Sequence, residues 1–156
     1  MEELFLTYRD MLLKTKRGNN CGIVSNAKPL YVISIIDAID EEVIIDNKIY
    51  FDCPNLLEIY KHNYMKHQND GKSMFRANAK VTPFNMPYFH LNAEPYYHIK
   101  WKEGIKIPKQ AQSPSNKFLK ESVEFAFLDI NLWNLLKNPL MRHNLQESLI
   151  TKFILE

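Results

Sequence analysis

Hydrophobic residues recur at helical spacing along most of this 156-residue chain, and strict alternation of apolar and polar residues is confined to short stretches. Apolar side chains three or four positions apart lie on one face of a helix, whereas alternating ones lie on one face of a strand. Pro, Ser, Asp or Asn stands at the start of several helical stretches, as is typical of caps and first turns. The pattern predicts helices at about residues 2–16, 30–39, 54–66, 116–122, 130–137 and from 139 nearly to the end.

The stretch from Leu30 to Ile39 is apolar on almost every side. A helix of this composition is buried all round rather than along one stripe. We therefore predict that it is the central helix of the core. A chain of this length, with 46% hydrophobic residues, is large enough for one domain with a full core of its own.

Two stretches rich in aromatic and β-branched residues favour strands. Residues 83–101 hold six of the nineteen aromatic residues, and we predict a hairpin with strands at 88–91 and 96–101 and a turn at 92–95. A second hairpin is predicted at 43–45 and 48–51, around Asp46 and Asn47. The expected fold class is α+β: a compact, mainly helical single domain over residues 1–156 with one or two short β-hairpins.

The net charge of +2 hides a strong segregation of charge. Residues 37–60 carry seven acidic side chains and one basic one, whereas residues 61–109 carry nine basic side chains and three acidic ones. Basic side chains neutralise phosphates and aromatic rings meet bases or sugars, so the second block indicates a nucleic-acid surface. Two other interpretations stay open: the lysines form an ordinary solvated face, and the aromatic residues close the core.

Few features indicate a catalytic or metal site. His62 and His67 are five positions apart and do not share one helical face, as a metal-binding pair on a helix would. The glycine-containing loop after Arg17 lacks the spacing of a P-loop, and no serine or cysteine stands in a nucleophile elbow. We therefore expect no cofactor, no metal and no enzymatic activity.

The expected location is the cytoplasm, without a membrane partner. Two cysteines do not suggest a disulfide framework. The N-terminus is acidic and amphipathic, unlike a secretory signal, and the longest apolar runs are too short to cross a bilayer.

Short motifs spread over most of residues 1–155 follow an order that one protein family shares. They are Lys28-Pro29-Leu30 with the apolar helix, Asn47-Lys48-Ile49, Met86-Pro87-Tyr88-Phe89-His90-Leu91, Tyr96-Tyr97-His98-Ile99, Phe127-Leu128-Asp129, Leu135-Leu136, Asn138-Pro139, Arg142, Leu145 and Leu149. Together they resemble the DNA sulfur-binding domain found beside the HNH nuclease domain in McrA-like restriction endonucleases. The resemblance implies a mainly helical domain that binds double-stranded DNA and, in the better-known members, recognises a backbone phosphorothioate.

The resemblance places a sulfur pocket at Met86, Pro87 and His90. In the family, a Tyr-Pro-x-x-Ala stretch makes a small apolar surface for the sulfur; here Pro87 is kept, Met86 replaces the Tyr and His90 replaces the Ala. Either His90 fills the space that a sulfur needs, or it points away toward a phosphate and leaves that space open. The expected DNA contacts are Lys14, Lys16, Arg17, Lys28, Lys72, Arg76 and Lys80.

We therefore expect a double-stranded DNA-binding module of bacterial restriction or defence, which recognises phosphorothioate, another modification or a particular sequence. Any nuclease activity is expected on a separate partner subunit. Two alternatives stay open: a protein-interaction subunit of such a system that has lost DNA contact, and an unrecognised nuclease.

Overall fold

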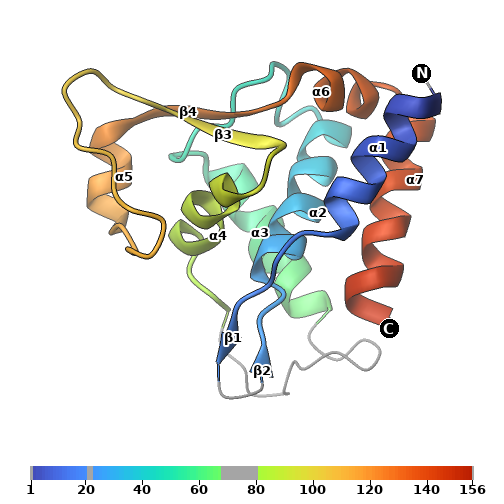
Figure 1. Ribbon diagram of the computed structural model, residues 1–156, viewed down its shortest axis with the longest axis horizontal. Helices are drawn as coiled ribbons and strands as arrows, with labels where there is room; N and C mark the ends of the chain where they lie inside the picture. The colour runs from blue at the N-terminus through green and yellow to red at the C-terminus, as the bar shows by residue number, and fades with distance from the viewer. Residues whose placement is uncertain (1, 21–22, 68–80, 156) are drawn as a thin grey trace.

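The computed structural model describes residues 2–20, 23–67 and 81–155, and helix α2 (Ala27–Asp40) lies at its centre. In Figure 1, α2 passes between α1 (Glu2–Leu13) and α7 (Pro139–Ile150) on one side and α3 (Pro54–Lys66) and α4 (Asn85–His90) on the other. Eleven of the fourteen residues of α2 are buried, because apolar side chains surround its axis and neighbours cover every face. The predicted central helix is confirmed.

Two small antiparallel sheets join these helices. Strands β1 (Asn19–Asn20) and β2 (Ile23–Val24) form one, and β3 (Tyr97–Trp101) and β4 (Val123–Leu128) form the other. The remaining elements are α5 (Asn116–Ser122), α6 (Ile130–Lys137), a 3-10 turn at Leu91–Ala93 and a π-helical turn at Thr151–Leu155. The α+β, mainly helical fold class is confirmed.

Most helix boundaries agree with the sequence pattern. Ser115 caps α5 by accepting a hydrogen bond from the Phe118 amide, and Asn138 caps α7 in the same way. Asp129 stands at the N-cap position of α6, but its side chain makes no capping bond and instead bonds two other elements. Helix α1 ends at Leu13 rather than near residue 16.

The aromatic hairpin predicted at 88–101 is wrong in its first strand. Residues 88–91 belong to α4 and the 3-10 turn, and β3 pairs instead with β4, where His98 lies opposite Phe127. A short apolar run does not distinguish a strand from a buried helix. Here the helix buries Pro87, Tyr88 and Phe89, so packing against α2 decides the conformation.

The hairpin predicted at 43–51 is also wrong. Within that segment, only Ile49 makes a bridge, which is isolated and joins it to Ala126 of β4. Asn47 explains the difference, because its side chain substitutes for a strand partner: Nδ2 donates to Leu128 O at 2.7 Å, and Leu128 N donates to Oδ1 at 2.9 Å. The segment is therefore fastened to β4 rather than folded on itself.

A network of buried tyrosines fixes α4 against the centre. Tyr31 of α2 and Tyr97 of β3 share a hydroxyl hydrogen bond at 3.0 Å, and Tyr97 also donates to Tyr88 O at 2.7 Å. The Tyr88 hydroxyl donates in turn to Ile49 O at 2.7 Å. Buried phenols need such partners, so these bonds hold the side chains of α4 in one position. No helix in the described ranges is long and apolar enough to cross a membrane.

Candidate functional site

An open hollow of about 200 Å³ lies where the start of α2 meets α4. Its exposed wall is almost entirely apolar, and the lining residues are Gly18, Ser25, Ala27, Lys28, Thr82, Met86, Pro87 and His90. Pro87 is buried in the first turn of α4, where Pro is tolerated because the first turn of a helix leaves its amides unpaired. The structure thus brings the expected pocket residues Met86, Pro87 and His90 together, and places Lys28, expected only as a DNA contact, beside them.

His90 forms part of the wall and leaves the hollow open. Its ring faces the segment that follows β3: Nε2 lies 3.4 Å from Ser113 Oγ, and Nδ1 lies 3.3 Å from Gln110 Nε2. Gln110 also donates to His90 O at 3.1 Å. Partial burial, and after it the nearby charge of Lys28, lower the pKa of His90, so the neutral ring is favoured.

Lys28 points its ammonium group at a buried carboxylate. Its Nζ lies 3.0 Å from Glu94 Oε2, and the two side chains are only 14% and 6% exposed. The Lys16 amide also donates to Glu94 Oε2, at 3.4 Å. Glu94 was not predicted as a site residue, because the sequence marks it only as one of three acids in the basic stretch 61–109.

The other cations expected to contact DNA differ in whether a protein group already binds them. Arg17 donates to Asn26 Oδ1 at 2.9 Å, and its guanidinium lies 5.0 Å from the centre of the Phe153 ring. Lys14 pairs with Asp10 at 2.9 Å on the exposed side of α1. The side chain of Lys16 is exposed. Lys72, Arg76 and Lys80 lie outside the described residues.

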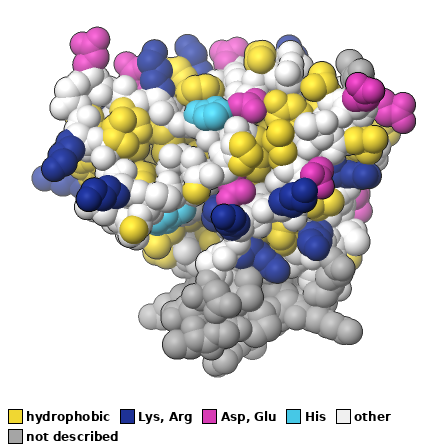
Figure 2. All heavy atoms as spheres, viewed as in Figure 1, with side chains coloured by type: hydrophobic (Ala, Val, Ile, Leu, Met, Phe, Trp, Pro, Cys, Tyr) yellow, Lys and Arg dark blue, Asp and Glu magenta, His cyan; other side chains and the backbone are white. Residues whose placement is uncertain are grey.

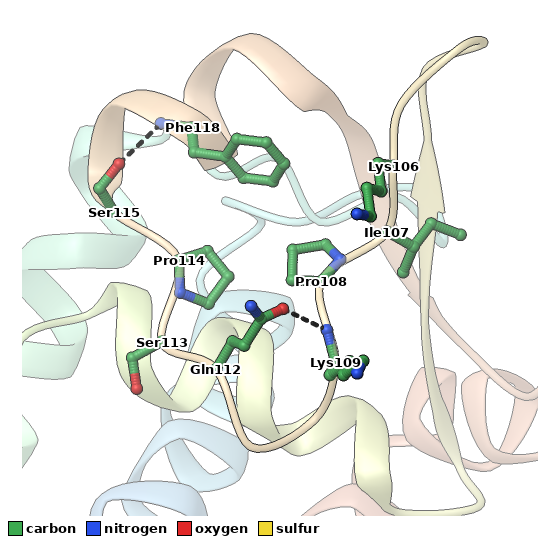
Figure 3. Close-up of a pocket in the computed structure, with 9 residues that line it drawn as sticks. All are labelled: Lys106, Ile107, Pro108, Lys109, Gln112, Ser113, Pro114, Ser115 and Phe118. Carbon is green, nitrogen blue, oxygen red and sulfur yellow. Dashed lines mark hydrogen bonds between the residues drawn. The ribbon is translucent and has the colours of Figure 1, made fainter.

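A second, larger hollow is lined by the segment whose Ser113 lies near His90. It measures about 610 Å³, and Figure 3 shows the rings of Pro108, Pro114 and Phe118 around it with Lys106 and Lys109 beside them. We call residues 102–115 the basic loop. Its lysines were visible in the charge pattern, but the sequence did not show that the loop lies against α4.

Hydrogen bonds join the basic loop to the first hollow. Besides the bonds of Gln110 and Ser113 to His90, the Asn92 side chain donates to Gln110 Oε1 at 3.0 Å, and Asn85 donates to Pro114 O at 3.0 Å. Figure 2 shows Lys and Arg side chains at the left edge and across the middle of this face, with Asp and Glu side chains among them. The basic loop, which lines the second hollow, is therefore bonded directly to α4, which lines the first.

A separate polar cluster joins β3, α1 and the start of α6. His98 Nε2 lies 2.6 Å from Asp129 Oδ1, and the Tyr8 hydroxyl donates to Asp129 Oδ2 at 3.1 Å. The described residues contain no group of three or more His, Cys, Asp or Glu side chains placed to hold a metal ion.

The outer face of the β3–β4 sheet carries a row of aromatic rings. Ring centres are 6.2 Å apart for Tyr50 and Phe125 and again for Phe125 and Phe127, and 5.2 Å apart for Phe127 and His98. Tyr50 is 52% exposed. Aromatic side chains on an exposed sheet face are typical of protein interfaces.

Comparison with models of known protein families gives no match, and no curated protein matches the chain. The resemblance to the DNA sulfur-binding domain therefore rests on the motifs of the chain itself.

Proposed function

We propose that this chain is a double-stranded DNA-binding module that recognises a phosphorothioate in the DNA backbone, as part of bacterial restriction or defence. The observation that carries the proposal is the small apolar hollow formed by Met86, Pro87 and His90 beside the cation Lys28. These are the residues at which the family resemblance places a sulfur pocket.

The charge around the hollow supports contact with a DNA backbone. Lys16 and Arg17 precede the segment that lines one side, and Lys106 and Lys109 belong to the basic loop on the other. Phosphate contacts of this kind position a protein on DNA and contribute most of the affinity, without specifying sequence. The described surface thus offers cations on both sides of one apolar centre.

The chemistry of the hollow supports selection of sulfur. A phosphorothioate replaces one phosphate oxygen by a larger, more polarisable and poorly hydrated atom. An oxygen loses hydrogen bonds to water on entering an apolar hollow, whereas a sulfur loses little and gains dispersion contacts with its wall. Since the His90 ring leaves the hollow open, we expect a preference for sulfurated DNA of more than about tenfold.

No cofactor enters this proposal, and DNA cleavage is assigned to a separate nuclease partner. The second candidate function is a protein-interaction subunit that has lost DNA contact. The aromatic row of exposed Tyr50 and half-buried Phe125 and Phe127 favours that alternative, because none of its residues lines the hollow.

The test is a titration of the protein with a plain duplex and a phosphorothioate duplex of one sequence, each at several salt concentrations. We expect micromolar or tighter binding at about 50 mM salt, weakening as salt rises, and tighter binding to the sulfurated duplex. Lys106→Gln should reduce the salt slope by about 0.9 on both duplexes, whereas Lys137→Gln at the end of α6, with the same charge change, should not. Absence of binding to either duplex at low salt would refute the DNA proposal and leave the interaction subunit.

A further inference from the structure

We propose that Glu94 determines the specificity of the hollow, by neutralising Lys28 so that an ordinary phosphate gains little there. The inference rests on the proposed function and concerns the same site. It is based on one contact: the buried carboxylate of Glu94 lies 3.0 Å from the ammonium group of Lys28. Among the described residues that line the hollow, Lys28 is the only lysine, arginine or acid.

The position of Glu94 is fixed by the elements around it. Its amide donates to Leu91 O as the chain leaves the 3-10 turn that follows α4. Two residues later, the Tyr96 hydroxyl shares a 2.6 Å hydrogen bond with Thr15, in a fully buried position. The carboxylate is therefore held rigidly between the end of α1 and the first turn of α2.

The electrostatics of the pair differ from those of an exposed lysine. Lys28 stands in the first turn of α2, where the helix dipole disfavours a cation, and both charges are largely removed from water. Breaking such a pair leaves an uncompensated charge, so the carboxylate keeps the ammonium group in place. An anion that reaches the hollow meets a neutral pair rather than a lone cation.

This neutrality favours sulfur over oxygen. A free ammonium group would form a short charge-assisted hydrogen bond with a phosphate oxygen. Sulfur is a weak hydrogen-bond acceptor, so a phosphorothioate would gain less from the same group. Holding Lys28 on Glu94 therefore removes a contact that would favour plain DNA, and leaves the apolar wall to make the distinction.

Glu94→Gln tests the inference, because it preserves shape while releasing the charge of Lys28. We expect the affinity for a plain duplex to rise about tenfold, and that for the phosphorothioate duplex to change much less, so that the selectivity falls about tenfold. The matched control is Asp10→Asn, which releases the exposed Lys14 with the same change in net charge. It should strengthen both duplexes alike and leave the selectivity unchanged.

A second variant covers the case in which Glu94→Gln fails to fold. The double variant, Lys28→Gln with Glu94→Gln, removes both charges and so leaves the pair neutral again. It should retain the selectivity of the unaltered protein. If the Lys28–Glu94 pair were only structural, breaking it would change the thermal stability of the protein but not the ratio of its affinities for the plain and the phosphorothioate duplex. Unchanged selectivity in Glu94→Gln, or loss of selectivity in the double variant, would overturn the inference while leaving DNA binding itself established. Failure of the unaltered protein to bind DNA would instead refute the proposed function.

Discussion

At the scale of single residues, His90 is the histidine in the wall of the hollow, and its pKa is shifted. Partial burial and the charge of Lys28 lower the pKa of His90, so the free protein holds a neutral ring at neutral pH. Because the pKa of His90 is higher in the unfolded chain, the unfolded chain takes up a proton before the folded protein does. The folded protein therefore loses stability as pH falls from about 6.5 through the folded pKa. A bound phosphate has the opposite effect, because a negative charge beside the ring raises its pKa.

We therefore predict that DNA affinity increases as pH falls from about 7.5 to about 5.5, since binding then takes up a proton at His90. His90→Gln, which keeps hydrogen-bonding capacity, should flatten this dependence. The control is His143→Gln, at an exposed position on α7. Titrations of one duplex at a series of pH values decide the matter: an identical pH profile in His90→Gln would show that the ring does not face a phosphate.

The side chains at the hollow also show how far the sequence could predict the site. The resemblance predicts Met86, Pro87 and His90 as one pocket, whereas the sequence predicts Lys28 only as a DNA contact and does not place it beside them. Glu94 was not predicted, since an acid in a basic block has no local pattern that marks it as buried. Its role depends on α4 and α2 meeting in space, which local sequence does not encode.

At the scale of elements, local signals predicted the helices and failed for the strands. Caps and prolines at Pro54, Ser115 and Asn138 act within a few residues of their own helix, so their effect is visible in sequence. The partner of β3 was misassigned because a strand pairs according to tertiary packing, and the true partner, β4, lies well downstream. Asn47 likewise acts on a distant backbone group.

Asn47 is expected to stabilise the fold by fastening its segment to β4. Its side chain satisfies both the amide and the carbonyl of Leu128, and all three groups are partly buried. Asn47→Ala would leave two backbone groups without these partners, so we expect a loss of about 1–3 kcal/mol in the free energy of unfolding. Urea denaturation measures it, with Asn144→Ala on the exposed side of α7 as the control. A loss no larger than that of the control would show that water replaces Asn47 there.

At the scale of the whole molecule, the two surfaces lie on different elements. The hollow and the basic loop belong to the junction of α2, α4 and residues 102–115, whereas the aromatic row lies on the outer face of β3 and β4. DNA bound at the first surface leaves the second available. Under the proposed function, the second surface would be free to hold a separate nuclease partner.

Two half-buried carboxylates, Asp37 and Asp129, bind side chains from other elements of the fold. Asp37 accepts hydrogen bonds from Asn63 and Gln146, and Asp129 accepts from Tyr8 and pairs with His98. Because these acids hold elements of the fold together, we predict that the purified protein does not cleave plain or phosphorothioate DNA with magnesium, manganese or zinc. The assay is incubation of supercoiled plasmid with the protein through successive purification steps, beside a His98→Ala variant. Cleavage that follows the protein and disappears in that variant would contradict the prediction, and would assign nuclease chemistry to the His98–Asp129 pair.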